Sequence, residues 1–348
     1  MGGVENHVKM ISERLAKSNE VHVITTNPLR TLPCEEWVEG VKILRFRTFA
    51  PNEAYHFSPK LRTYLKKCSR NYDIVHAHSY HDLPAYYAAI SKANNKLVFT
   101  PHFHGTVGHT FFRNLLHVIY KPFFGRKIFL KADRILYCNN FEKNKIESAF
   151  GDLNGKLERI REPPILDNLQ QLKSTRRTNH DRKTILCVSR IEKYKNIHYI
   201  IKALPLLPSH VQLQVVGKGP YKPELKRLIK SLHLEERIIF SQDLTEKEML
   251  ECYASADVGV LLSSHEQYGL FIAEALSSGM PCVVTDKDAL SEWIDEKNCI
   301  GVNHPIKVKE VAHAILNALD GRVADVKLPT ASDYVQKLRS LYSEICSN

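Results

Sequence analysis

Short apolar runs rich in β-forming residues alternate along this chain with amphipathic helical stretches. A first series, EVHVITT, KILRF, DIVHAH, KLVFT and RILYC, ends before a polar stretch at residues 173–183. A second series follows, with the runs TILCVS, VQLQVVG, RIIF, DVGVLL and PCVVTD. Strands that alternate with helices of about 10–15 residues indicate parallel sheets built from β-α-β units. The chain is therefore predicted to be an α/β protein with two Rossmann-like, doubly wound parallel-sheet domains facing a cleft.

The polar stretch sets the expected domain boundary. We place the first domain at residues 1–170 and the second at 171–330, and we expect a terminal helix at 331–346 to pack back onto the first domain. The chain opens with a turn and a helix before any strand, whereas the first strand of a doubly wound sheet is central. The first N-terminal strand is thus expected to be missing, which would leave backbone groups of its neighbours unpaired.

The composition indicates the class of protein and the cellular compartment in which it works. With 348 residues, 43% hydrophobic and 25% charged, the chain resembles a soluble globular protein of about two domains. The 8 cysteines are scattered without a CxxC pair, which indicates a reducing compartment, and no apolar run approaches the ~18 residues of a membrane span. We therefore predict a cytoplasmic protein. The net charge of +11 favours anionic partners, but the basic residues are spread out and no nucleic-acid-binding motif is visible, so no nucleic acid is predicted.

Two glutamates stand eight residues apart in HEQYGLFIAEALSSG, at Glu266 and Glu274. The preceding LLSS ends a strand, HEQYG is predicted to be a loop, and LFIAEALSS is predicted to be a helix that Gly279 ends. Glu266 then lies before the helix and Glu274 inside its second turn. The two carboxylates need not share a face, because they can reach different parts of one extended ligand.

Backbone amides lie between the two glutamates. Tyr268, Gly269 and Leu270 occupy the predicted helix N-terminus, where N–H groups without intrahelical partners form an anion site. A ligand with a diphosphate in its middle and hydroxyl groups at each end fits this arrangement.

A second group of candidates follows the strand TILCVS. Arg190 and Lys195 lie in SRIEKYKN, at the carboxyl edge where open α/β sheets bind ligands. Two cations there can neutralise a diphosphate leaving group without a metal. Gly217 and Gly219 in VVGKGPY follow the next strand and allow close backbone approach, although they can equally form an ordinary strand-to-helix turn.

These motifs resemble those of the retaining family-4 glycosyltransferases of GT-B fold (glycosyl transferases group 1), and the resemblance covers nearly the whole chain. The segments that carry it are GGVENH (2–7), YDIVHAHS (72–79), FTPHFHG (99–105), KADRILYC (131–138), SRIEKYKN (189–196), VVGKGP (215–220), YASADVGVLLSSHEQYGLFIAEALSSGMPCVVTD (253–286) and the terminal helix.

The resemblance implies a role for each donor-side candidate in the second domain. Arg190 and Lys195 would contact the donor diphosphate, Glu266 the hydroxyls of the donor sugar, and Glu274 the ribose hydroxyls. The amides of Gly269 and Leu270 would face phosphate or sugar.

In the first domain, the resemblance implies that Gly3 lines the cleft near the diphosphate and that His102 approaches the transferred sugar, with His104 as the alternative. The family's reaction is retaining transfer by same-face attack. It would move a hexose-type sugar from a nucleotide-diphosphate sugar to a glycan, lipid-linked or small-molecule acceptor, with no metal and no cofactor. His102, Glu266, Arg190 and Lys195 are then the expected catalytic residues.

The chain departs from the family pattern at two loops. It has REPPILD (161–167) where the family usually has Pro-Asn-Gly-Val-Asp, and KDALSE (287–292) where a glycine pair is usual. These departures and the missing first strand keep one alternative open, a non-catalytic nucleotide- or glycan-binding subunit. A second alternative is a nucleotide-sugar epimerase of the same two-domain shape, which the arginine–lysine and paired-glutamate set disfavours.

Two further patterns allow more than one interpretation. A histidine group suggests a polar acceptor cleft or, less simply, a zinc site; its members are His76, His78, His81, His102, His104 and His109. The basic, aromatic-rich segment 109–134 is predicted either to lie on an anionic membrane as a peripheral contact at the inner face of the cell membrane, or to pack on its own sheet. Pro122 and Gly125 are expected to break that segment into two pieces.

Overall fold

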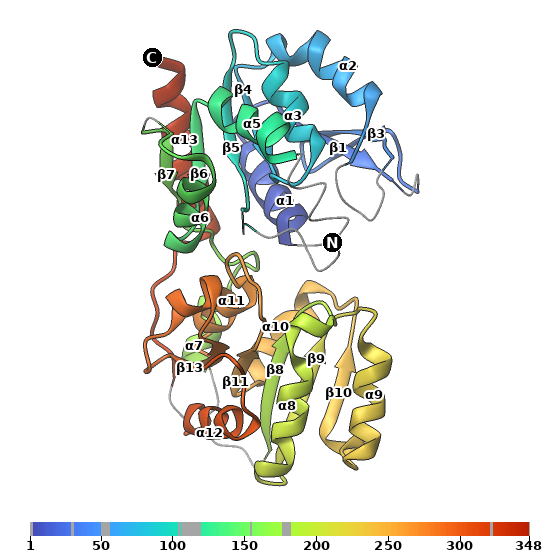
Figure 1. The fold of residues 1–348 in the computed structure, drawn as a ribbon, viewed down its shortest axis with the longest axis vertical. Coiled ribbons are helices and arrows are strands. Elements are labelled where there is room, and N and C mark those ends of the chain that lie inside the picture. Colours follow the sequence, from blue (N-terminus) through green and yellow to red (C-terminus); the bar gives the residue numbers. More distant parts are fainter. Residues whose placement is uncertain are drawn as a thin grey trace. The chain divides into compact units, whose positions relative to one another are not determined.

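The computed structural model describes residues 3–28, 31–49, 56–103, 105, 120–153, 155–175, 182–320 and 323–347. The chain divides into two compact units (Figure 1). Unit 1 comprises Met1–Glu162 and Ala331–Asn348, and unit 2 comprises Pro163–Thr330. This boundary lies before the predicted residue 170. Ile165 and Leu166, which follow it, donate backbone hydrogen bonds to the Glu274 carboxylate of unit 2.

Unit 1 contains both termini of the described chain and alternates strands with helices. Its elements are α1 (Gly3–Leu15), β1 (Val21–Asn27), β2 (Glu35–Val38), β3 (Val41–Arg47), α2 (Pro59–Cys68), η2 (Ser69–Asn71), β4 (Ile74–His78), α3 (Leu83–Ile90), β5 (Lys96–Thr100), η3 (Lys121–Gly125), α5 (Arg126–Lys131), β6 (Arg134–Tyr137), α6 (Asn140–Phe150), β7 (Leu157–Arg159) and α13 (Ala331–Ser347).

The described strands of unit 1 form two sheets, in the orders β1-β3-β2 and β4-β5-β6-β7. Within them β1 pairs only with β3, and β4 only with β5, so each has one edge without a strand partner. Val21 of β1 and Ile74 of β4 nevertheless pack on one apolar cluster.

The terminal helix α13 packs against α1. Leu338 and Leu341 share a buried cluster with Met10 and Ile11, and Val98 of β5 contributes to the same cluster. The segment after unit 2 therefore completes the core of unit 1, as expected from the sequence.

The β2–β3 hairpin was not predicted. Its strands are antiparallel, and Glu39 (φ 48°) and Gly40 (φ 78°) form the turn between them. Two consecutive residues with positive φ are typical of the tight turns that match strand twist. The segment EEWV carries no alternating apolar pattern, and Trp37 is exposed, so sequence periodicity could not reveal this strand.

Helix α5 also differs from the expectation. Lys121–Gly125 forms a π-helical turn that runs directly into α5, so Pro122 and Gly125 do not break the helix. Gly125 has a packing role instead, because a Cβ there would lie 2.3 Å from the hydroxyl oxygen of Tyr80. Residues 109–119 of the predicted amphipathic segment lie outside the described residues.

Unit 2 contains a single described sheet flanked by helices. Its elements are α7 (Leu169–Thr175), β8 (Lys183–Val188), η4 (Lys193–Lys195), α8 (Ile197–Ala203), η5 (Leu204–Leu206), β9 (Val211–Val216), α9 (Lys222–Ser231), η6 (Glu235–Arg237), β10 (Ile238–Ser241), α10 (Glu246–Ser255), β11 (Val258–Leu261), α11 (Leu270–Ser277), β12 (Cys282–Thr285), η7 (Asp288–Trp293), β13 (Cys299–Val302) and α12 (Val308–Ala318).

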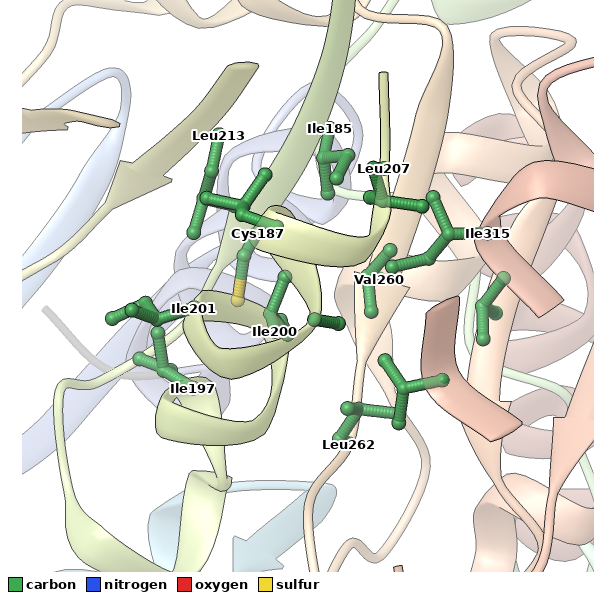
Figure 2. Packing of buried hydrophobic residues seen from close by; sticks show 14 of the residues in the cluster. Ile185, Cys187, Ile197, Ile200, Ile201, Leu207, Leu213, Val260, Leu262 and Ile315 are labelled. Atoms are coloured by element: carbon green, nitrogen blue, oxygen red, sulfur yellow. The ribbon is translucent and has the colours of Figure 1, made fainter. Parts of the chain in front are cut away.

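The sheet of unit 2 has the order β10-β9-β8-β11-β12-β13, and all of its described strand pairs are parallel. Helix α8 covers one face, and Figure 2 shows Ile197, Ile200 and Ile201 packing beside Cys187 and Leu213. The two predicted Rossmann-like domains are thereby confirmed. The described residues contain no helix long and apolar enough to cross a membrane.

Candidate functional site

The sheet of unit 2 reverses its winding at β8, which pairs with β9 on one side and β11 on the other. The loops after β8 and β11 therefore leave the carboxyl edge next to each other. In open α/β sheets, such a topological switch point is the usual place for a ligand. Both predicted groups of donor-side residues begin at these two loops.

A buried ion pair joins the two loops. The Lys195 Nζ, in η4, contacts the Glu266 Oε1, and the Ser263 hydroxyl donates to the same oxygen at 2.9 Å. Burial lowers the pKa of Lys195, but the neighbouring Glu266 carboxylate outweighs it and the net shift is upward. The ammonium therefore stays charged at the switch point.

A backbone-to-side-chain network fixes the same junction. Asn196 adopts a left-handed conformation (φ 58°), and its Nδ2 donates to the Leu262 carbonyl and to the Ser264 hydroxyl, both at 2.8 Å. Sequence reasoning identified neither Asn196 nor Ser263 as part of the site. Their positions beside Lys195 and Glu266 in sequence were the available signal.

Arg190 lies outside the Lys195–Glu266 pair. Its side chain is 69% exposed, and its guanidinium contacts the Glu192 carboxylate at 3.0 Å and donates to the Tyr194 hydroxyl at 2.8 Å. An exposed guanidinium on the loop after β8 is accessible to an anionic ligand.

The glycine pair in VVGKGPY is required by close packing. A Cβ on Gly217 (φ 146°) would lie 2.0 Å from the Ser189 carbonyl oxygen, and one on Gly219 would lie 2.2 Å from that of Ile191. The Ile191 N–H also donates to the Lys218 carbonyl at 2.9 Å. The turn after β9 thus lies directly against the loop that carries Arg190.

Helix α11 begins where the sequence predicts, at Leu270, with Gly269 as its N-cap in a left-handed conformation (φ 87°). A Cβ on Gly269 would lie 2.8 Å from the Leu290 Cδ2. Both the backbone conformation and the packing therefore favour glycine at this position. The buried Tyr268 accepts a hydrogen bond at its carbonyl from the Trp293 Nε1 at 2.7 Å. The first-turn amides of α11 point out of the helix N-terminus, and their contact with a phosphate or sugar stays a prediction.

Glu274 is buried inside α11. Its Oε2 accepts a hydrogen bond from the Tyr253 hydroxyl at 2.6 Å. Burial raises the pKa of Glu274, although Tyr253 and the backbone N–H groups of Ile165 and Leu166 favour the charged form. The carboxylate therefore ties the start of unit 2 to α11, and its contact with a ribose stays a prediction.

The departure in KDALSE has a structural counterpart. Asp288 stands where the family usually has glycine, and it takes a left-handed conformation (φ 52°). Aspartate tolerates that region better than most residues. Its Oδ2 lies 3.1 Å from the Nδ1 of His265, the residue before Glu266.

Unit 1 contains the other predicted site residues. Gly3 is the first residue of α1, and a Cβ there would meet no atom within 4 Å. His102, which follows β5, has both ring nitrogens near protein groups: Nδ1 is 3.2 Å from the Glu162 Oε1, and Nε2 is 3.4 Å from the His78 Nδ1. The alternative, His104, lies outside the described residues.

The histidine group is partly assembled, with one unpredicted member. His76 bonds the Tyr342 hydroxyl through Nδ1 at 2.6 Å and the Thr100 hydroxyl through Nε2 at 2.7 Å. His7 of α1, which sequence reasoning missed, lies 5.8 Å from His102 between ring centroids.

Of the other members, His81 stacks on Phe103 instead, and His109 falls outside the described residues. Among the residues that the structure describes, no three His, Cys, Asp or Glu side chains are grouped to hold a metal.

Comparison with known proteins finds a matching family model for each part of the chain. Residues 1–162 match the model described as Glycosyltransferase Family 4, and residues 170–336 match Glycosyl transferases group 1. The alpha-monoglucosyldiacylglycerol synthase of Streptococcus pneumoniae is 30% identical over 159 residues, which are 44% of this chain and 36% of that enzyme. This chain therefore spans about a third of the length of that relative.

Two comparisons cover most of the chain. An uncharacterized glycosyltransferase of Methanocaldococcus jannaschii is 24% identical over 318 residues, covering 84% of this chain and 79% of the relative. The structure of Anabaena HepE in complex with UDP has a TM-score of 0.75 and 18% identity, covering 99% of this chain and 96% of HepE. With the family models on both units and the GT-B fold, this chain belongs to the family-4 glycosyltransferases of glycosyl transferases group 1.

Proposed function

We propose that this protein is a retaining, metal-independent glycosyltransferase that moves a hexose-type sugar from a nucleotide-diphosphate sugar to a glycan, lipid-linked or small-molecule acceptor. The observation that carries the proposal is the Lys195–Glu266 pair at the switch point of unit 2. That pair holds a buried cation and a carboxylate side by side at a sheet edge, with the Arg190 guanidinium on the same loop. A diphosphate and a polyhydroxylated sugar are ligands of matching chemistry.

The chemical step assigns a role to each group. The bond between the sugar C1 and the phosphate oxygen breaks, the acceptor oxygen bonds to C1 on the same face, and the acceptor proton passes to the departing phosphate. Arg190 and Lys195 stabilise the negative charge on the leaving diphosphate, so neither a metal nor another cofactor is required. Glu266, oriented by Lys195 and Ser263, accepts hydrogen bonds from the sugar hydroxyls.

A thermal-shift panel of UDP, GDP, ADP and their sugar conjugates, with EDTA present, tests donor binding. A ligand that binds only the folded state raises the free energy of unfolding by about 2.7 kcal/mol when its concentration is a hundred times Kd. We expect one nucleotide to raise Tm and Arg190→Ala to abolish the shift. The matched control is Arg227→Ala, which removes an arginine of similar exposure (77%) on α9.

The products decide between the functional classes. Transfer with retention at C1, observed by NMR of the product, supports the proposal, whereas inversion refutes the retaining mechanism. A nucleotide-induced shift without transfer or donor hydrolysis would indicate a non-catalytic subunit, and an epimerised sugar would indicate an epimerase. No shift with any nucleotide overturns the donor site.

A second part of the proposal is that the protein is cytoplasmic and associates peripherally with the inner face of the cell membrane. On the helical segment 121–131, Phe123 and Leu130 are 64% and 52% exposed. Arg126, Lys127 and Lys131 are exposed beside them. Apolar and cationic side chains on one exposed helix match an anionic bilayer surface, and the pneumococcal relative is named for a diacylglycerol product.

Co-sedimentation with vesicles tests this part separately. We expect binding to vesicles that contain phosphatidylglycerol, weaker binding to pure phosphatidylcholine, and loss of binding in the double variant Arg126→Glu and Lys127→Glu. The control variant Arg227→Glu should bind like the wild type. Equal binding of the double variant and the wild type would refute a role for this helix.

A further inference from the structure

The loop Pro101–Phe103, at the carboxyl end of β5, holds a strained residue in unit 1. His102 has a φ of 48°, in the left-handed region that few non-glycine residues adopt. Such a conformation costs on the order of 1 kcal/mol or more and persists only where surrounding contacts enforce it. Two buried carboxylates, from two different elements, supply those contacts.

The first carboxylate belongs to Glu142, in the first turn of α6. Its Oε1 accepts a hydrogen bond from the Phe103 N–H at 2.7 Å, and its Oε2 accepts one from the Cys138 N–H at 3.0 Å. Glu142 is 1% exposed. This side chain therefore ties the loop after β5 to the loop after β6 and holds the residue that follows His102.

The second carboxylate belongs to Glu162, after β7, which contacts the His102 ring at 3.2 Å. Burial raises the pKa of Glu162, but the charge that His7 carries in acid and the hydrogen bond and charge of His102 outweigh it and lower the pKa to about 2. Burial lowers the pKa of His102, yet Glu162 raises it, and the net shift is upward. The two side chains therefore form an ion pair inside unit 1.

The groups around His102 favour a positive charge on its ring more than on the neighbouring histidines. Burial lowers the pKa of His7 to about 4 and that of His78 well below its usual range, so both neighbouring rings are neutral near pH 7. Glu142 and, from α1, Glu5 add negative potential that favours the charged His102 ring. Among the described imidazoles of this cluster, His102 is the one whose pKa is shifted upward, whereas the pKa values of His7, His76 and His78 are lowered.

A purely structural explanation fits these observations poorly. A buried ion pair often stabilises a fold no more than apolar side chains of the same size would, and the left-handed His102 adds a further cost. Two unfavourable features in one loop are typical of sites where position matters for function. Glu162 also lies in REPPILD, where the chain departs from the pattern of its family.

We propose that Glu162 is a positioning residue: it holds the His102 side chain charged and fixed, and with Glu142 it fixes the Pro101–Phe103 loop for glycosyl transfer. This proposal rests on the proposed function, in which His102 approaches the transferred sugar. Glu162 acts through His102 and does not itself touch the donor or the acceptor.

The test is Glu162→Gln, which keeps the shape of the side chain and removes its charge. We expect kcat to fall at least tenfold with little change in the KM for the donor. Without its counter-ion His102 loses its proton at lower pH, so the alkaline limb of the pH–rate profile should move to lower pH. Glu162→Asp should recover part of kcat. The matched control is Glu158→Gln, a more exposed glutamate of β7.

Each outcome bears on the proposal. A Glu162→Gln enzyme that is less stable but has the wild-type kcat and pH profile would overturn it, because a structural role alone predicts that result. A second measurement does not depend on turnover: histidine ring ¹⁵N NMR should show a charged His102 at pH 7 in the wild type and a neutral one in Glu162→Gln. If the wild type transfers no sugar, the proposed function fails, and the same spectra still decide whether Glu162 holds the His102 charge.

Discussion

Acid should loosen unit 1 through His7. This side chain is buried in α1, and its Nε2 lies 3.2 Å from the hydroxyl oxygen of Tyr334 on α13. Burial lowers its pKa from 6.5 to about 4, with Glu162 opposing the shift and His102 adding to it. The histidine therefore joins α1 to α13 in its neutral form.

The sign of the pH effect follows from linkage. Below pH 6.5 the unfolded chain binds a proton at His7, whereas the folded chain does not until about pH 4. The contribution of His7 to stability is thus complete above pH 6.5 and is lost as the pH falls to about 4. At about 1.4 kcal/mol per pH unit, the loss over this window is roughly 3 kcal/mol.

The other buried groups of this cluster change stability in different ways. Burial lowers the pKa of His76 to about 3. Protonation of His76 therefore also lowers stability in acid, and this loss continues to a lower pH than the loss at His7. The lowered pKa of Glu162, about 2, adds stability that is lost as the pH falls from 4.5 to 2. The raised pKa of His102 acts in the opposite direction, because its contribution is lost as the pH rises.

The variant His7→Gln isolates the His7 contribution, since glutamine can still bond Tyr334 but does not titrate. Hydrogen exchange of α1 and α13 peptides, measured from pH 7 to 4 and corrected for intrinsic exchange, reports the stability of unit 1. The pH dependence of that stability should be about 1.4 kcal/mol per unit shallower in the variant. The control His313→Gln removes an exposed histidine of α12 in unit 2. An unchanged slope in His7→Gln would refute the reasoning.

Three further substitutions test unit 2. Tyr253→Phe removes the hydroxyl that donates to the buried Glu274 carboxylate, and urea unfolding should show a loss of about 1.5–3 kcal/mol; a loss near zero would mean that the bond contributes little. Thr245→Ala breaks the capping box with Glu248 on α10, so the free energy of unfolding should fall by about 1 kcal/mol and Tm by about 2–4 °C in a thermal scan. Gly219→Ala places a Cβ 2.2 Å from a carbonyl oxygen, so nucleotide affinity measured by calorimetry should fall, and an unchanged Kd would contradict the close packing of this turn against the Arg190 loop.

The sequence by itself determined the two α/β domains, because strand and helix periodicity is a local property that survives without tertiary contacts. It also located the β8 and β11 loops, since Lys195 and Glu266 each follow an apolar strand and parallel strands place their carboxyl ends at one edge. The strands β2 (EEWV), β7 (LER) and β13 (CIGV) escaped notice, and the first two contain too many charged residues to show an apolar pattern.

Only the tertiary structure decided which polar side chains are buried and what they face. Glu142 and Glu162 look like ordinary surface glutamates in sequence, yet each is enclosed and holds the loop that contains His102. His7 bonds Tyr334, a residue more than 300 positions away in the chain. Such pairings depend on how α1, β5, α6 and α13 pack within unit 1. Burial changes the charge of a group through its surroundings, which no local pattern of residues encodes.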